Sequence, residues 1–427
     1  MILELVNKDS SILRQSSKKV TDFKSVKSLL ANMEETLLFT GGIGLAAPQV
    51  GHNLAIFVLN IPTKPKIFIN PKITSYSKEI VDLEEGCLSI PGYRAYVPRS
   101  KEVTIEYFDK FGKKKVVKAT KLLGHAVQHE TDHLNGILYP DLLSDKSKIY
   151  KVVPIRIVFF GTPQFGVPTL TKLISLKHSF EYEVVGVVTQ SPSSPIAQTA
   201  QKYDTPVIYC PPKGVSLKNP DFVKKIADLK PDLMVVASFG RILPKELLDL
   251  ARLGNLNVHG SLLPKYRGAS PIQTAISVGE KVSGLTIMLM NEKMDEGDLL
   301  SNAEIKIDGQ DTYETYANKL SAVAPILLVN TMHAWVNKRV KPLPQDHKLA
   351  TYTKILTKSD GFVELNNPPK NLGNLIRAYH PWPGVWTKMA NGKTLKLLPD
   401  KKVQLEGKSP VSLDEFKRGY RDFRLDW

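Results

Sequence analysis

The stretch QHETDH, residues 128–133, places two histidines four residues apart with a glutamate directly after the first. On a helix, side chains at positions i and i+4 share one face, so His129 and His133 can offer ring nitrogens to one metal ion. Glu130 would then lie beside the metal as a candidate general base. Helices that merely carry histidines also match this pattern by chance, so a third ligand has to decide between the two interpretations.

A candidate third ligand is Cys87, which lies in EEGCLSIPGY, 42 residues before His129. A thiolate with two imidazoles leaves a fourth position open for water, which is the arrangement of catalytic rather than structural metal sites. His125 lies one turn before His129, so spacing alone leaves it open as an alternative ligand. The only other cysteine is Cys210, and two cysteines do not indicate a disulfide framework.

A second group of polar residues lies in LGNLNVHGSLLPKYRG, where Asn257, His259 and Ser261 alternate along an extended segment. Open α/β sheets bind ligands at the carboxyl ends of their strands. Further on, MNEKMDEGD presents a carboxylate, Asp295. A lone Asn-x-His is more often a hydrogen-bonded strand end, so this group needs support from the surrounding sequence.

The elements that carry the first group form an α+β domain, predicted over residues 1–153. A helix is predicted over 25–40, a hairpin over 103–119 with its turn at 109–112, and a second helix from Thr120 to Gly136. The two histidines thus lie on the second helix.

The second group belongs to a different architecture, predicted over residues 154–340. Apolar strands such as IRIVFF and PDLMVVA alternate with helices, which indicates an α/β doubly wound sheet. The turn at Gly161 lacks the G-x-G-x-x-G spacing, so no NAD site is expected. The proline-bearing segment 341–355 is interpreted as a linker, and residues 356–427 as a small basic domain.

Length and charge agree with a multidomain globular protein. The chain has 427 residues, 42% of them hydrophobic, and no apolar run approaches the roughly 18 residues that span a bilayer. No signal-peptide pattern opens it, so we expect a cytoplasmic protein with no membrane partner. The net charge is +6 over residues 1–153, +1 over 154–330 and +9 over 331–427. Such a concentration of positive charge is typical of a surface that faces RNA, although a solvated basic face has the same composition.

The first 150 or so residues resemble peptide deformylase, whose motifs have the forms G-x-G-x-A-A-x-Q, E-G-C-x-S and Q-H-E-x-D-H. Here these are Gly42–Gln49, Glu85–Ser89 and Gln128–His133. The resemblance implies removal of formate from the N-terminal formyl-methionine of nascent polypeptides, including those at the ribosome. It assigns Cys87, His129 and His133 as ligands of Fe²⁺, with Zn²⁺ or Ni²⁺ also able to occupy the site. Glu130 would transfer the proton, while Gln49 and the backbone N–H of Leu88 would stabilise the oxyanion.

The rest of the chain resembles methionyl-tRNA formyltransferase, through GTPQF, NVHGSLLPKYRGASPIQ, TIMLMNEKMDEGD and RAYHPWPGVW. The resemblance implies formylation of initiator methionyl-tRNA with 10-formyltetrahydrofolate as co-substrate. It assigns Asn257, His259 and Asp295 as catalytic, and it needs no metal for this step. The residues that it places at the folate site are consecutive, Ser261, Leu262, Leu263 and Pro264.

The family also has a C-terminal OB-like β-barrel that contacts tRNA, and the basic segment 356–427 matches its place. Two departures from the family concern the strength and selectivity of tRNA binding: the loop after Gln190 is short, and so is the C-terminal region. We therefore expect a bifunctional enzyme that attaches and removes formyl groups in translation. Three alternatives remain: the second half formylates a small amine such as a sugar nucleotide or glycinamide ribonucleotide, it is a non-catalytic tRNA-binding scaffold, or the first half is a general metallopeptidase.

Overall fold

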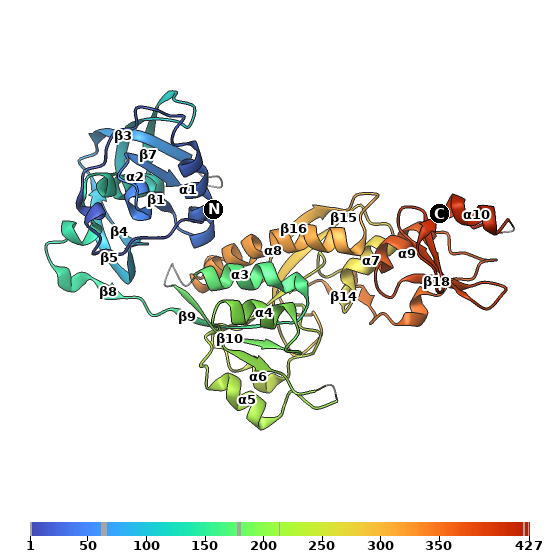
Figure 1. The fold of residues 1–427 in the computed structure, drawn as a ribbon. Helices are drawn as coiled ribbons and strands as arrows, with labels where there is room; N and C mark the ends of the chain where they lie inside the picture. The colour runs from blue at the N-terminus through green and yellow to red at the C-terminus, as the bar shows by residue number, and fades with distance from the viewer. Residues whose placement is uncertain (1, 61–65, 177–180, 213, 422, 426) are drawn as a thin grey trace. The chain divides into compact units, whose positions relative to one another are not determined.

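A computed structural model describes residues 2–60, 66–176, 181–212, 214–421, 423–425 and 427 (Figure 1). The chain divides into two compact units. The first comprises Met1–Ile155 with Ile174–Glu183, and the second comprises Arg156–Leu173 with Val184–Trp427. None of the described helices combines the length and the apolar character needed to cross a bilayer.

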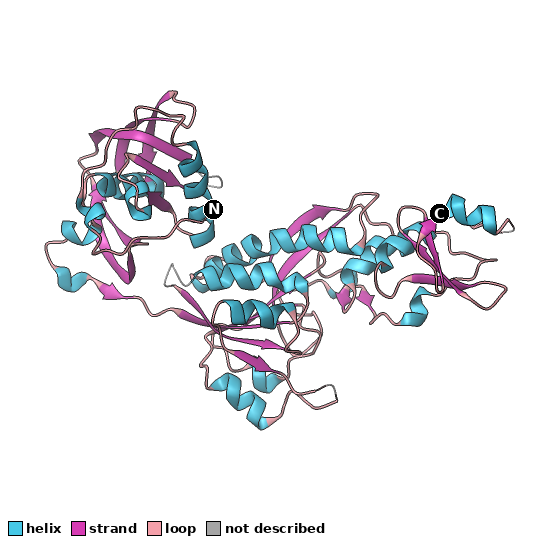
Figure 2. Cartoon of the chain, viewed as in Figure 1, coloured by secondary structure: helices cyan, strands magenta, loops and turns pink. Residues whose placement is uncertain are grey.

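The first unit contains a five-stranded antiparallel sheet and two long helices (Figure 2). The helices are α1 (Lys27–Thr40) and α2 (Lys121–Leu134), close to their predicted bounds. The predicted hairpin is confirmed, because Gly112 N donates to Asp109 O within the turn at 2.9 Å. The sheet has the order β1 (Gly44–Ala46), β2 (Ile56–Leu59), β3 (Lys66–Tyr76), β6 (Glu102–Phe108), β7 (Lys114–Thr120).

Alternation along β2 lets both faces of this sheet bury apolar side chains. Ile56 and Val58 join the core cluster that contains α1, whereas Phe57 and Leu59 join the cluster that contains α2. All four side chains are fully buried, as expected for a strand covered on both faces. The helix α2, which carries the histidines, therefore packs on the second face of the sheet.

A smaller sheet carries the cysteine. Cys87 ends strand β4 (Ile80–Cys87), which pairs with β5 (Ile90–Ser100), and the short β8 (Tyr150–Lys151) pairs with β5. Within its described residues, the unit also contains the short 3₁₀ helices η1 (Ser11–Arg14), η2 (Ala47–Val50), η3 (Tyr139–Leu142) and η4 (Lys146–Lys148).

The second unit is built on a seven-stranded sheet. Strand β12 pairs in parallel with both β9 and β13, and β10 pairs in parallel with β11, whereas β15 and β16 add antiparallel strands at one edge. The order is β11 (Val207–Tyr209), β10 (Tyr182–Thr189), β9 (Ile155–Gly161), β12 (Leu233–Ala237), β13 (Asn255–His259), β15 (Val282–Leu289), β16 (Leu299–Lys306).

Helices cover both faces of this sheet. Val158 and Phe160 of β9 share a core cluster with Phe222 of α5, whereas Phe159 points to the opposite face, near Ile196 of α4. This confirms the predicted α/β class. The helices are η5 (Gln164–Gly166), α3 (Val167–Ser175), α4 (Pro195–Lys202), α5 (Pro220–Ala227), α6 (Lys245–Leu248), α7 (Pro271–Ser277) and α8 (Tyr313–Val336).

The C-terminal part has its own apolar core and a four-stranded antiparallel sheet of order β18-β19-β20-β21. Among the residues described here, these strands do not close into a barrel, so the predicted OB-like barrel is not confirmed. Its elements are η8 (Lys358–Gly361), α9 (Leu372–Tyr379), β18 (Val385–Lys388), β19 (Thr394–Leu398), β20 (Lys402–Leu405), β21 (Val411–Ser412) and α10 (Leu413–Gly419).

The segment interpreted as a linker, 341–355, belongs to the second unit and packs closely against other parts of it. It contains η7 (His347–Leu349) and the short strand β17 (Tyr352–Thr353), which pairs in parallel with β14 (Arg267–Gly268). Gln345, between Pro344 and η7, is only 5% exposed. The segment therefore does more than connect two parts of the chain.

Candidate functional sites

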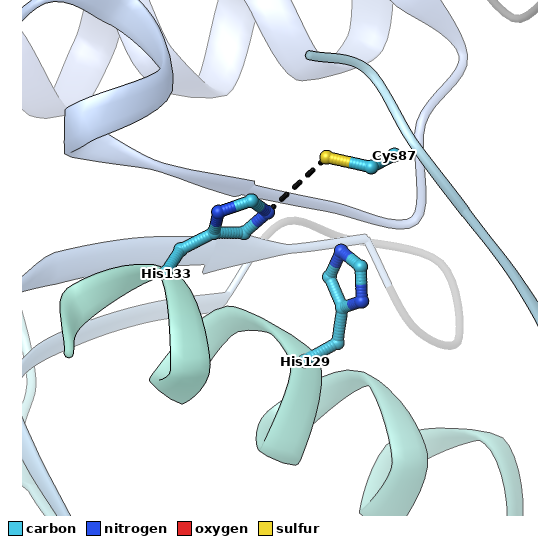
Figure 3. Close-up of side chains that lie close together, drawn as sticks. All are labelled: Cys87, His129 and His133. Carbon is cyan, nitrogen blue, oxygen red and sulfur yellow. Dashed lines mark hydrogen bonds between the residues drawn. The ribbon is translucent and has the colours of Figure 1, made fainter. Parts of the chain in front are cut away.

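The three predicted metal ligands meet in the first unit (Figure 3). His129 and His133 project from one face of α2 toward Cys87, which approaches from the end of β4. Their ligand atoms all lie within 4.8 Å of one another, and Cys87 Sγ is 3.3 Å from His133 Nε2. Among the described residues this is the one such group of three or more histidine, cysteine or acidic side chains.

These residues fit a metal ion. Tetrahedral coordination with a metal–sulfur distance of about 2.3 Å and metal–nitrogen distances of about 2.1 Å separates sulfur from nitrogen by roughly 3.5 Å. The distance between Cys87 Sγ and His133 Nε2 is close to that value. His125 does not join the group, so the alternative ligand set is not supported.

Glu85 orients the ligand His129 from behind. Its Oε2 lies 2.7 Å from His129 Nδ1, which leaves Nε2 of that imidazole available to bind a metal ion. His125 Nε2 lies 2.9 Å from the other carboxylate oxygen, and Arg99 Nη2 donates to Glu85 Oε2 at 2.9 Å. Burial alone would raise the pKa of Glu85, but His125, His129 and Arg99 together hold this pKa well below its usual range. The carboxylate thus stays ionised and fixes the imidazole.

Glu130 is the candidate base, and it is only 3% exposed. Burial raises the pKa of Glu130 to about 7, so its carboxyl can both accept and release a proton near neutral pH. Its Oε2 has no hydrogen-bond partner within the described part of the chain. The side chain lies against Gly44 of β1, where an added Cβ would come within 2.1 Å of Glu130 Oε1.

Replacing Gly44 with alanine should therefore displace the Glu130 carboxylate, because the strand backbone cannot easily move away. We expect a loss of roughly 100-fold in the rate of the reaction that Glu130 serves. Steady-state rates with a formylated peptide measure the effect. The control is Gly309→Ala, since a Cβ at Gly309 meets no atom within 4 Å; equal rates for both variants would contradict this role for Gly44.

Gln49 is held so that its amide faces the same cluster. Its Oε1 accepts a hydrogen bond from Ala46 N at 2.8 Å, and this contact directs Nε2 toward Cys87 Sγ at 3.3 Å. Leu88 follows Cys87 directly, at the turn between β4 and β5. The side chain of Gln49 and the backbone of Leu88 therefore lie beside Cys87, where sequence reasoning predicts the oxyanion donors.

The second predicted group also meets, at the carboxyl end of β13. Asn257 and His259 are two residues apart, so their side chains lie on the same side of that strand, and both are buried. Asn257 Nδ2 donates to Asp295 Oδ1 at 3.4 Å, and His259 Nδ1 lies 3.7 Å from Asp295 Oδ2. Asp295 Oδ2 also accepts from Gly268 N at 2.7 Å. An amide, an imidazole and a carboxylate thus share one site.

The tautomer of His259 follows from its other neighbour. His259 Nε2 lies 3.0 Å from Tyr266 O, and a backbone carbonyl can only accept a hydrogen bond. The neutral imidazole therefore carries its proton on Nε2, which leaves Nδ1, on the Asp295 side, as the basic nitrogen.

The four consecutive residues predicted at the folate site form the loop that follows β13. Ser261 Oγ donates to Lys265 O at 2.6 Å, and Thr286 of β15 accepts from Leu263 N and donates to Ser261 O. Ser261 and Leu263 are buried, whereas Leu262 and Pro264 are partly exposed. The loop is thus anchored to β15 next to the Asn257 and His259 side chains.

Sequence reasoning missed two contributors to the first site. The sequence motif contains Glu85 but predicts no role for it, although its place two residues before Cys87 in β4 puts it on the same face of the strand. Tyr139 shares a core cluster with Cys87, and its ring stacks on His129 with centroids 6.4 Å apart. No spacing rule links Tyr139 to the site.

Three family models match the chain. The model described as "Polypeptide deformylase" matches residues 2–148, "Formyl transferase" matches 155–332, and "Formyl transferase, C-terminal domain" matches 355–401.

Proteins of two kinds are similar to this chain. A methionyl-tRNA formyltransferase of Bacillus velezensis is 40% identical over 258 residues, which are 58% of this chain and 78% of the relative. One of Caldanaerobacter subterraneus is 39% identical over 268 residues, 60% of this chain and 84% of the relative. Similar solved structures include a peptide deformylase of Synechococcus elongatus, 37% identical with TM-score 0.34, covering 34% of this chain and 81% of that chain. A peptide deformylase of Thermotoga maritima is 34% identical with TM-score 0.33, and the match covers 34% of this chain and 99% of that chain.

Proposed function

We propose two activities for this chain, because it belongs to the methionyl-tRNA formyltransferase family and its residues 2–148 form a polypeptide deformylase domain. Residues 155–427 would formylate initiator methionyl-tRNA from 10-formyltetrahydrofolate, and the first domain would remove formyl from the N-terminal methionine of nascent polypeptides. The single observation that carries the proposal is that the chain brings together two separate groups of side chains. One has the donors for a metal ion, and the other contains Asn257, His259 and Asp295.

For deformylation, Cys87, His129 and His133 would hold the ion, with Fe²⁺ proposed and Zn²⁺ or Ni²⁺ as substitutes. The bound ion would supply a water of lowered pKa and polarise the formyl carbonyl. Glu130 takes the proton from the attacking water and delivers it to the departing amine. The formyl C–N bond breaks, and formate and a free N-terminus leave. An encounter with the substrate at the ribosome is part of this proposal.

Gln49 would donate to the oxyanion through Nε2, together with the backbone N–H of Leu88. Replacing Gln49 with leucine should lower kcat for deformylation by roughly 10²–10³-fold. Asn53→Leu is a suitable control, since Asn53 is a partly exposed amide of the same unit that contacts Gln15 instead. Deformylation by Gln49→Leu at the wild-type rate would exclude the amide from the reaction.

For formyl transfer, the α-amine of methionyl-tRNA attacks the formyl carbon, and the bond from this carbon to N10 of the folate breaks. Asn257 has two amide hydrogens, and only one is used by Asp295, so the other can donate to the oxyanion. Protonated His259 gives further stabilisation, and Asp295 orients the imidazole. One proton leaves the amine and one reaches N10, so the transfer is balanced.

Binding of tRNA is proposed for the basic C-terminal domain, residues 356–427. Phosphate contacts by lysine and arginine would make this binding weaken steeply with salt. The proposed domains are residues 1–153, 154–340 and 356–427, with the segment 341–355 between the second and the third.

The test follows labelled formyl from 10-formyltetrahydrofolate to initiator methionyl-tRNA, with glycinamide ribonucleotide and an amino sugar nucleotide as competing acceptors. A second assay follows formate released from a formylated peptide. We expect tRNA alone to be formylated and formylated peptides alone to be cleaved. Transfer to a small amine, no transfer at all, or cleavage of unformylated peptides would each contradict the proposal.

A further inference from the structure

The segment 341–355 reaches the second reaction centre through one buried side chain. Gln345 Nε2 donates to Asp295 O at 2.9 Å and to Gly297 O at 2.7 Å. The first carbonyl belongs to Asp295 itself and the second lies two residues later in the chain. Asp295 has a left-handed backbone, with φ 53°. An isolated aspartate rarely adopts this conformation, so surrounding contacts have to hold it.

The other end of the same amide binds a buried cation. Gln345 Oε1 accepts from Arg267 Nε at 3.1 Å and from Arg267 Nη2 at 2.8 Å. Arg267 is fully buried, and its remaining neighbours are Glu296, His347 and Tyr352. A buried guanidinium requires such partners, because an unpaired charge is costly in the interior. The amide of Gln345 therefore couples Arg267 to the Asp295 backbone.

The backbone on either side of Arg267 faces the reaction centre. Tyr266 O accepts from His259 Nε2, and Gly268 N donates to Asp295 Oδ2. The segment 341–355 holds these residues too, since Tyr266 N donates to Thr351 Oγ1 at 2.8 Å and Arg267 N to Thr351 O at 2.8 Å.

Gly268 allows this close approach. Its φ is 109°, and a Cβ there would lie 2.6 Å from Thr353 O. The segment and the loop thus meet backbone to backbone, in an arrangement that does not tolerate a side chain at position 268.

We propose that Gln345 is a positioning residue for formyl transfer, which fixes the Asp295 carboxylate against Asn257 and His259 by tying its backbone to buried Arg267. The inference rests on the proposed formyl-transfer function. Gln345 does not contact the reacting atoms; it acts through Asp295. The segment 341–355 is accordingly a functional part of the transferase centre.

The test compares Gln345→Glu and Gln345→Met with the wild-type full chain. Glutamate keeps the acceptor for Arg267 but replaces the amide donors with an oxygen that faces two carbonyls, whereas methionine keeps the length and removes both functions. We expect kcat for formyl transfer to fall roughly 10–100-fold in both, with KM for tRNA and for the formyl donor within about twofold of wild type. Leu349→Ala is the matched control, because this side chain of the same segment is 61% exposed.

A kcat within about twofold of wild type in Gln345→Glu would overturn the inference. So would a rise in both KM values together with a lowered melting temperature, because that result indicates a merely structural residue. Absence of formyl transfer by the wild-type chain itself would overturn the proposed function and the inference with it. Deformylation is measured in the same preparation and should be unchanged.

Discussion

Replacing Glu130 with glutamine should slow deformylation by the full chain by roughly 10²–10⁴-fold, the usual contribution of a general acid–base group. The amide occupies the same volume next to Gly44 but cannot take a proton from water. Formyl transfer should be unchanged, because the residues proposed for it lie in a different unit. Formate release from a formylated peptide measures the first rate, and formylation of methionyl-tRNA the second.

Glu79→Gln provides the matched control, since this exposed glutamate pairs with Lys101 at the surface. It should deformylate at the wild-type rate. If Glu130→Gln deformylates as fast as Glu79→Gln, Glu130 is not the base, whatever the metal content of the protein.

Replacing His259 with alanine should have the converse effect on the two activities. Formyl transfer should fall by roughly 10²–10³-fold, and deformylation should be retained. The substitution removes both the nitrogen that faces Asp295 and the donor that anchors the ring to Tyr266 O. Initial rates at saturating tRNA and formyl donor report the loss in kcat.

The same substitution at His52, which is exposed, should leave both rates unchanged. Equal losses in the two activities of His259→Ala would show that the variant damages the whole chain, and an unaffected transferase would remove His259 from the mechanism.

Local periodicity was sufficient to predict how the ligands are grouped. The helical repeat put His129 and His133 on one face of α2, and the two-residue repeat of a strand put Asn257 and His259 on one side of β13. Cys87 and Asp295 come from other parts of the sequence, and no periodicity links them to the histidines. Their assignment to the two sites depends on the family motifs. Their distances to the histidines required the structure.

The contacts around Gln345 could not be predicted in this way. Pro342 and Pro344 made the segment look like a linker, because prolines interrupt regular structure. Whether such a segment lies free or packs depends on tertiary partners, here Arg267, 78 residues earlier in the chain. Closure of the C-terminal sheet is equally a tertiary property, and strand patterns in the basic segment could not specify it.

Metal removal from the full chain tests most directly whether two independent centres share one polypeptide. Both activities are measured in one preparation before dialysis against a chelator, after it, and after Fe²⁺ or Zn²⁺ is restored. Loss of the ion from Cys87, His129 and His133 should abolish deformylation, restored metal should recover it, and formyl transfer should stay constant throughout. Deformylation that survives complete metal removal, or formyl transfer that falls and recovers in parallel with it, would contradict the proposed separation of the two chemistries.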